Sequence, residues 1–182
     1  MSLEQLSRQL NSQQQGTGNK IPPVELWDPP YCGELDLQIN ADGLWFYNGT
    51  PFKRLSLVKL FASVLTKQAN DYFLVTPVEK VKIRVEDAPF ILTNWQWQAP
   101  EQTHMLVTTN MEDQFILDGE HPLTISKSGA LYVVVRRNLL AKVHRNIYYQ
   151  WVDLAQPQTD ERGTELIFTS AGQRFSLGNI HD

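Results

Sequence analysis

The chemistry that this sequence offers most clearly is the binding of negative charge. Between His121 and Val152 the chain has five basic residues and no Asp or Glu. These basic residues are Lys127, Arg136, Arg137, Lys142 and Arg145. The whole chain has a formal net charge of -4, so the remainder is strongly acidic. Guanidinium groups beside helix amides commonly hold phosphate or carboxylate, and the segment therefore favours an anionic ligand.

Two basic pairs, Lys53-Arg54 and Arg136-Arg137, stand where a predicted strand leads into a predicted helix. A helix N-terminus already carries about half a positive charge, so arginine is unfavourable there unless an anion lies close by. We predict an anionic ligand near four basic residues: Arg54, Arg137, Lys142 and Arg145. Two alternatives stay open, namely simple solvation and pairing with the chain's own acids, such as Glu79, Asp87 or Glu165.

Motifs for catalysis or metal binding do not appear in the sequence. It has no Gly-x-Ser-x-Gly elbow, no phosphate-binding loop and no Gly-x-Gly-x-x-Gly run. The histidines lack the spacing of metal ligands; they are His104, His121, His144 and His181. We therefore predict no metal site and no cofactor.

Trp95 and Trp97 share one face of a predicted strand. Such a pair is more typical of core or subunit-interface packing than of a stacking platform for bases. The sequence thus allows a homodimer or another protein partner at this position.

Composition limits the class of protein. The chain has 182 residues, of which 42% are hydrophobic and 20% charged, which fits one domain or two small ones. A sequence pI near 5.6 argues against a nucleic-acid binder. Cys32 is the single cysteine, so an intramolecular disulfide is excluded. The first twenty residues lack the apolar core of a secretory signal, and the longest apolar run, 130–135, is too short to span a bilayer. We expect a cytoplasmic protein that does not insert into membranes.

The first half predicts two helices among short strands. Residues 2–10 fit a helix, in which Ser2 and Gln5 form a capping box and three leucines share a face. Residues 11–20 are predicted to be a mobile polar linker. A second helix is expected over about 57–65. Strands are expected over 35–39, 44–47, 72–75 and 81–85, the last with one solvated face. Asn48-Gly49 predicts a tight hairpin turn.

The second half predicts more strands and one long helix. Strands are expected over about 90–98, 103–109, 114–117, 122–126, 130–135, 164–169 and 173–177. A helix is predicted from about 138 to 154, with Asn138 as its cap. Its apolar stripe would be Leu140, Val143, Ile147, Trp151 and Leu154. Residues 157–163 are expected to be a loop.

The two halves resemble each other. Arg136 follows Lys53 by 83 residues, and at that offset Leu57 aligns with Leu140 and Val64 with Ile147. Thr76 and Thr169 would end equivalent strands. This pattern predicts a duplicated α+β unit, although any helix between strands could produce such an alignment by chance.

The sequence also resembles an uncharacterised bacterial family, domain of unknown function number 1285. The resemblance covers about residues 21–180. It is carried by four segments: 42–51, which continues through Arg54 into 57–61, and then 74–80, 85–90 and 135–141 with Arg145.

The resemblance implies a duplicated core, a C-terminal part like a pleckstrin-homology fold, and a ligand site between the halves. It suggests a nucleotide-like ligand and a role in signalling, and it supplies no catalytic residues. The expected fold is α+β, mostly antiparallel sheet, in two related units with one helix each. The expected segments are a polar tail (1–20), an N-terminal unit (21–86) and a C-terminal unit (87–182).

The predicted function is a non-enzymatic module that binds a small anionic ligand in the cleft between the units. In this prediction Arg54 and Arg137 neutralise charge, and Thr76 donates from a turn. Glu79 and Asp87 orient the arginines or accept from the ligand. The alternative is a protein-interaction or homodimerisation module that uses Trp95, Trp97 and a strand edge. An enzyme, the third option, would need Glu79 or Asp87 in a cleft with bound substrate.

Overall fold

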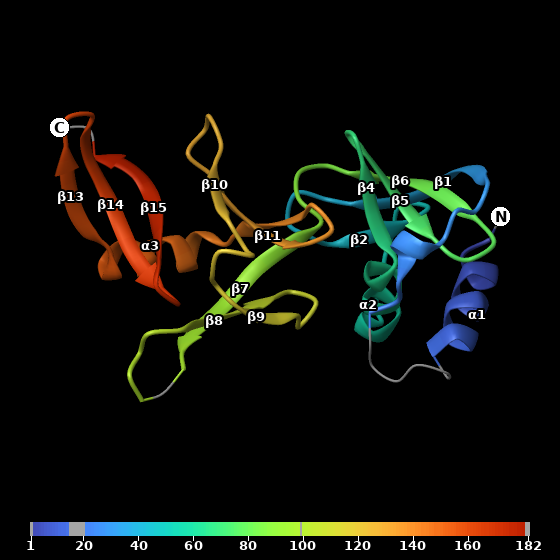
Figure 1. Cartoon of the computed structure of the whole chain (residues 1–182). Helices are drawn as coiled ribbons and strands as arrows, with labels where there is room; N and C mark the ends of the chain where they lie inside the picture. Colours follow the sequence, from blue (N-terminus) through green and yellow to red (C-terminus); the bar gives the residue numbers. More distant parts are fainter. Residues whose placement is uncertain (1, 15–20, 99, 181–182) are drawn as a thin grey trace. The chain divides into compact units, whose positions relative to one another are not determined.

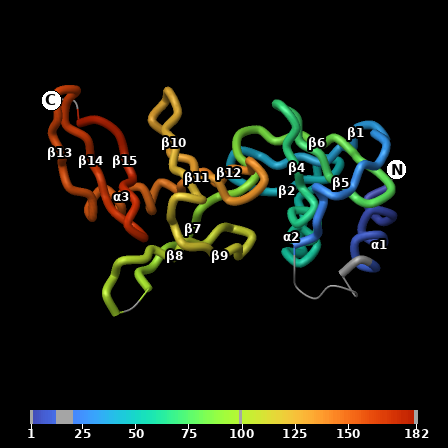
Figure 2. Tube along the Cα trace, viewed as in Figure 1, coloured from blue at the N-terminus to red at the C-terminus, as the bar shows by residue number. Residues whose placement is uncertain are grey.

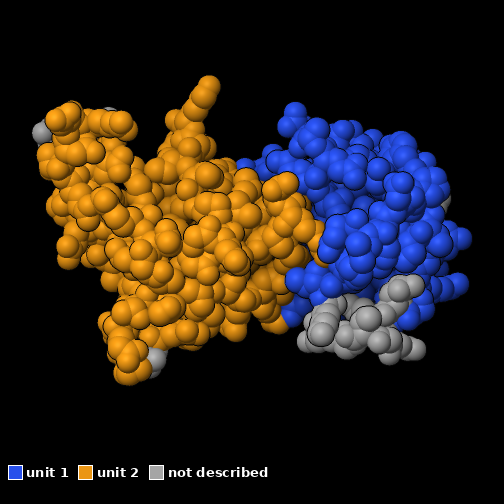
Figure 3. All heavy atoms as spheres, viewed as in Figure 1, with its two compact units in different colours: residues 1–87 blue, residues 88–182 orange. Residues whose placement is uncertain are grey.

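The computed structural model describes residues 2–14, 21–98 and 100–180. The chain divides after Asp87 into two compact units, unit 1 (residues 1–87) and unit 2 (residues 88–182) (Figure 3). No helix within the described ranges is long and apolar enough to cross a membrane.

Unit 1 begins with an amphipathic helix, α1 (Leu3–Gln14). The predicted capping box is confirmed, since the Ser2 amide donates to Gln5 Oε1 (3.2 Å) and the Gln5 amide to Ser2 Oγ (3.3 Å). Leu6 and Leu10 are fully buried, and α1 contacts α2 (Leu55–Ser63). The helix is longer than predicted, because residues 11–14 continue it. Residues 15–20, the remainder of the predicted linker, lie outside the described residues.

Unit 1 is built on a six-stranded sheet. Its strands, after a short 3-10 turn at Val24–Leu26, are β1 (Tyr31–Ile39), β2 (Trp45–Tyr47), β3 (Thr50–Pro51), β4 (Leu65–Gln68), β5 (Asp71–Val75) and β6 (Lys80–Val85). The strand order is β3-β2-β1-β6-β5-β4. Strands β1, β2, β4, β5 and β6 are labelled in Figure 1. Two antiparallel meanders therefore meet at one parallel pair, β1 with β6. The predicted Asn48-Gly49 turn is confirmed, with φ values of 47° and 74°.

The two faces of this sheet differ in character. Leu35, Leu37 and Ile39 of β1 point to a buried face, where α2 contributes Val58 and Phe61 to the core. The predicted solvated face of β6 is confirmed, because Val81 and Ile83 are buried while their neighbours Lys80, Lys82 and Arg84 are not. Strand β4 is not among the predicted strands, because its first residue, Leu65, fits the apolar stripe of the helix predicted over about 57–65.

Unit 2 contains a sheet of the same topology. Its strands are β7 (Phe90–Trp97), β8 (Met105–Thr109), β9 (Gln114–Ile116), β10 (Leu123–Ile125), β11 (Leu131–Arg136) and β12 (Leu139–Val143). The order is β10-β11-β12-β7-β8-β9, and the first and sixth strands again form the parallel pair. Helix α3 (Arg145–Leu154) follows, then a separate three-stranded sheet of β13 (Gln156–Asp160), β14 (Gly163–Ser170) and β15 (Gln173–Ile180).

The predicted helix over 138–154 is wrong over residues 138–144, because α3 begins only at Arg145. Residues 139–143 form β12, with Leu139, Ala141 and Val143 buried at a period of two. Arg137 and Asn138 have φ values of 48° and 61°, so they form the turn of a β11–β12 hairpin rather than a helix cap. Figure 2 shows the chain passing from β11 directly into β12 before α3. The cap of α3 is His144, whose Nδ1 accepts from the Asn146 amide (3.2 Å).

The duplicated α+β fold is confirmed, but the residue matching at an offset of 83 is wrong. The sheets correspond strand by strand, β1 to β7 through β6 to β12. In unit 1 the helix α2 lies between the third and fourth strands, whereas in unit 2 the helix follows the sixth. Leu57 thus lies in a helix, whereas Leu140 lies in a strand. Thr169 lies in β14, which has no counterpart among the described strands of unit 1. The pleckstrin-homology likeness of unit 2 stays a prediction.

Candidate functional site

Arg54 stands at the start of α2, as its N-cap residue. Its side chain is exposed and makes no capping hydrogen bond, and the first turn of α2 contains no acidic residue. The positive end of the helix is therefore next to a positive side chain, an arrangement that a bound anion would stabilise.

Thr76 and Glu79 form the turn between β5 and β6. The fully buried Thr76 hydroxyl accepts from the Val78 and Glu79 amides (3.3 and 3.1 Å) and lies 3.1 Å from Gln9 Oε1 in α1. Thr76 thus fixes its own turn and connects it to α1. Glu79 is half-buried, and its Oε1 has no hydrogen-bond partner among the described residues.

Asp87 lies at the other end of β6 from this turn and is half-buried. The six residues of β6 separate the two positions, a distance of roughly 20 Å at about 3.3 Å per residue. Unit 1 therefore brings Thr76 and Glu79 together and keeps Asp87 apart from them.

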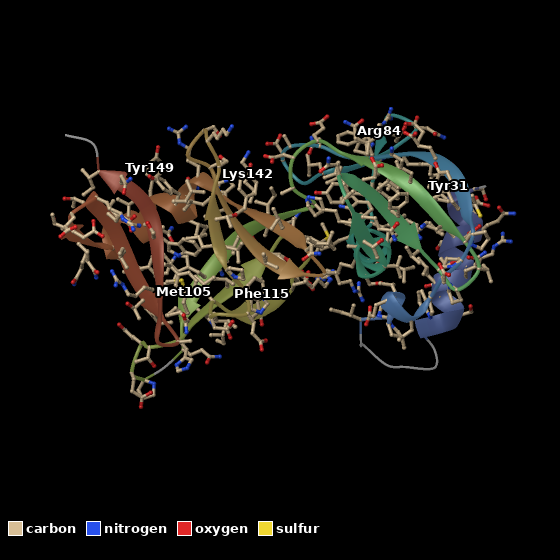
Figure 4. The ribbon with its side chains drawn as sticks, turned by 45° about the horizontal axis from the view of Figure 1, so that its top comes forward. Tyr31, Arg84, Met105, Phe115, Lys142 and Tyr149 are labelled. Carbon is tan, nitrogen blue, oxygen red and sulfur yellow. The ribbon has the colours of Figure 1, made fainter. Side chains whose placement is uncertain are left out.

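The three candidates of unit 2 follow one another along β12. Arg137 is in the turn before the strand, Lys142 is half-buried near its end, and Arg145 is the first residue of α3. Lys142, which is labelled in Figure 4, lies on β12. It is in register with Tyr132 of β11 and Ile91 of β7. The five residues of β12, a length of roughly 16 Å at about 3.3 Å per residue, lie between Arg137 and the start of α3.

Arg145 contacts Tyr149, one turn further along α3, in two ways. Its Nε donates to Tyr149 Oη (2.9 Å), and its guanidinium carbon lies 5.4 Å from the centre of the same ring. The first turn of α3 contains no acidic residue, as in α2. Both helices thus begin with an arginine where acidic residues are usual.

Arg136, also in the basic segment, is neutralised within unit 2. Its Nη1 lies 2.8 Å from Asp113 Oδ2, and its guanidinium covers the Phe90 ring at 4.8 Å. The two charged side chains are only 14% and 26% exposed. Internal pairing, one of the two alternatives left open by the sequence, therefore holds for Arg136, with Asp113 as the partner.

Trp95 and Trp97 are half-buried on β7, with ring centres 5.8 Å apart. The Trp95 indole donates to Gln150 Oε1 of α3 (2.7 Å). The pair therefore takes part in packing within unit 2 and keeps some exposed surface.

Histidines and acidic residues form no metal cluster in the part of the chain that the structure describes. His121 stacks on Phe115 at 4.1 Å, and His144 caps α3. His181 lies outside the described residues.

The sequence did not reveal a polar cavity of about 410 Å³ on the exposed face of the unit 1 sheet. Its lining includes Asp36, Arg84 and Glu86, which come from β1 and from β6 with its following turn. The alternation of apolar and polar residues along β1 and β6 indicates that Asp36 and Arg84 face solvent. No local sequence pattern indicates that β1 and β6 pair in parallel and so bring these residues together.

The same face holds a cross-strand ion pair between Lys82 and Asp71 (2.9 Å). The hydrogen bond to Asp71 raises the pKa of Lys82 above its ordinary value of 10.5. Desolvation acts in the opposite direction, and the charges of Asp71 and Glu34 add to the increase.

Comparison with known families assigns both units. The model described as "Domain of unknown function (DUF1285), N-terminal domain" matches residues 22–88. The model described as "Protein of unknown function (DUF1285), C-terminal domain" matches residues 89–177. The chain belongs to the DUF1285 family. Helix α1 precedes both matched ranges.

Two solved structures of DUF1285 family proteins resemble this DUF1285 chain. The protein from Silicibacter pomeroyi DSS-3 is 32% identical, with a TM-score of 0.78 over 94% of this chain and 95% of that one. The protein from Shewanella baltica OS155 is also 32% identical, with a TM-score of 0.54 over 64% of this chain and 90% of that one. A search of curated proteins finds no match.

Proposed function

We propose that the chain is a non-enzymatic module that binds a small anionic ligand. The observation that carries the proposal is the arginine at the start of α2 and of α3, in both cases with no acidic residue in the first turn. An arginine at a helix start reduces stability unless an anion compensates it. Residues that reduce stability are common where function requires them.

The ligand class follows from the donors. Guanidinium groups bind the oxygens of phosphate and carboxylate through paired hydrogen bonds. The positive charge in this proposal comes from Arg54, Arg137, Lys142 and Arg145. Glu79 Oε1, which has no hydrogen-bond partner among the described residues, would accept from a ligand amino or hydroxyl group. The family resemblance adds a nucleotide-like ligand and signalling in the cytoplasm to the proposal.

The first experiment is native mass spectrometry of freshly purified protein, followed by calorimetric titration with inorganic phosphate and with nucleoside mono-, di- and triphosphates. We expect a Kd in the nanomolar to micromolar range for at least one nucleotide. Arg137→Ala and Arg145→Ala should each weaken binding about tenfold or more, since a charge-assisted hydrogen bond contributes roughly 1.5–3 kcal/mol.

Arg162→Ala is the matched control, because Arg162 is an exposed arginine of unit 2 in the turn before β14. It should change the Kd less than twofold. Absence of any heat or thermal shift with every anion would refute the proposal. An equal loss in Arg162→Ala would reduce it to non-specific attraction by net charge.

Protein interaction is the second candidate, and Trp95 and Trp97 are the observation that favours it. Half-exposed aromatic residues are typical of the centre of protein interfaces. Light scattering across a concentration series should then show a dimer that Trp97→Ala weakens. A monomer at all concentrations would leave only a hetero-partner for this candidate.

A further inference from the structure

The cavity on the exposed face of unit 1 has the size and the chemistry of a binding site for a small ligand. Its volume of about 410 Å³ falls within the usual range for ligand pockets. Its lining comes from β1, β2, β6 and the turns beside them, all within one unit: Asp36, Gln38, Asn40, Phe46, Gly49, Arg84 and Glu86.

The polar side chains of the cavity hold one another in place. Arg84 pairs with Asp36 Oδ1, and Gln38 donates to Glu86 Oε1. The Ala41 amide donates to Glu86 Oε2 (2.9 Å). Arg84, which is exposed on β6, is labelled in Figure 4. The lining is therefore preorganised, which lowers the cost of ordering it around a ligand.

The charges of the lining do not cancel. Arg84 compensates Asp36, whereas the oxygens of Glu86 accept only from the neutral donors Gln38 and Ala41 among the described residues. One negative charge is therefore left on the cavity, at Glu86. The second oxygen of Asp36 has no described partner and remains available as an acceptor.

An aromatic ring accompanies this carboxylate. Phe46 is half-buried and is the cross-strand neighbour of Gln38, which in turn bonds Glu86. Phe46 and Glu86 line the same cavity. An aromatic ring that shares a cavity with an uncompensated carboxylate favours an organic cation, through cation–π attraction combined with a charge-assisted hydrogen bond.

We propose that this cavity binds a ligand with a single ammonium or guanidinium group, which contacts Glu86 while its carbon atoms cover Phe46. The group could belong to a free small amine or to a lysine or arginine side chain of a peptide. The proposal does not depend on the anionic ligand, since none of the residues predicted for that ligand lines this cavity.

The test is an NMR titration of the ¹⁵N-labelled full chain with n-butylammonium and with methylguanidinium. Binding should move the amide signals of Gln38, Phe46 and Glu86 together. Glu86→Gln should weaken binding about tenfold, because it removes the charge and keeps the shape. Glu34→Gln is the matched control, since Glu34 is an exposed β1 carboxylate outside the cavity lining. It should change the affinity less than twofold.

A second variant protects the test against a folding defect. If Glu86→Gln does not fold, Asp36→Asn also neutralises the cavity and should weaken binding. A capped tripeptide with central lysine, compared with its norleucine analogue, distinguishes the sources. Tighter binding than butylammonium assigns the cavity to a peptide, and weaker binding assigns it to a free amine.

Three results would overturn the proposal. They are no signal movement at millimolar amine, equal binding by wild type and Glu86→Gln, or equal movement with the uncharged analogue n-butanol. Movement of the same signals by acetate alone would also refute it, because the cavity would then recognise anions through Arg84.

Discussion

The two units share a strand order and stabilise it differently. In unit 1 the charged pair Arg84–Asp36 lies on the open face of the sheet, and both side chains are 54% exposed. In unit 2 the pair Arg136–Asp113 is largely buried, with Phe90 beneath the guanidinium. The same backbone topology can thus leave one polar face available for binding and use the other polar pair for packing.

The largest expected effect tests this difference in burial. Asp113→Ala removes the carboxylate that pairs with Arg136, and we expect unit 2 to lose about 2–4 kcal/mol, somewhat less than for a completely buried pair. Asp36→Ala in unit 1 should cost less than about 1 kcal/mol, because that pair is exposed to solvent. Urea denaturation followed by NMR signals of each unit measures both. Equal costs would contradict the contrast.

The next largest loss of stability is expected from changing the turn between the fifth and sixth strands, which in unit 1 connects β5 to β6. Thr76→Val removes a buried hydroxyl that accepts from two amides, which should destabilise unit 1 by about 1–3 kcal/mol. It should also loosen α1, since Gln9 loses its partner. In unit 2 the corresponding turn depends on backbone conformation, so Asn138→Gly should be almost neutral. Hydrogen exchange of α1 and of both turns provides the measurement.

Substitutions at the starts of α2 and α3 should change the stability of the protein in opposite directions. Arg54→Asp places a good cap and a favourable charge at α2, so we expect the ligand-free protein to gain about 1 kcal/mol. His144→Ala removes the existing cap of α3 and should lose a similar amount. Calorimetric melting of both variants checks the signs. A loss of stability in Arg54→Asp would show that Arg54 has a structural role.

The smallest effect concerns the Lys82–Asp71 pair of unit 1. Asp71→Asn should move the pKa of Lys82 back toward 10.5, because the hydrogen bond is the main cause of its increase. A raised lysine pKa stabilises the fold below pH 10.5, and this contribution disappears as the pH rises through the raised value. NMR titration of the lysine side chains follows both forms. An unchanged Lys82 would contradict the assignment.

Much of the fold could be predicted from the sequence where a local pattern had one physical solution. The Ser2 capping box, the Asn48-Gly49 turn and the alternation along β6 are such patterns. Residues 139–143 were ambiguous, because five mainly apolar residues fit both a period of two and a helical stripe. The strand β13 is exposed throughout and has no apolar periodicity that would reveal it.

The candidate site was predictable only as a set of residue types. The sequence predicts Arg54 at the start of a helix, and the structure places it there. For the second helix it predicts Arg136-Arg137 at the start, whereas the structure has Arg145 there. The pairing of Arg136 with Asp113 and the unit 1 cavity depend on strand neighbours that are far apart along the chain. No local spacing encodes such neighbours.

The parallel pair at the centre of each sheet has a consequence during biosynthesis. A hairpin can form as soon as its two strands have left the ribosome, but β1 must wait for β6, and β7 for β12. We therefore expect each unit to join its two halves last, with its middle strands exposed to other nascent chains until they pair.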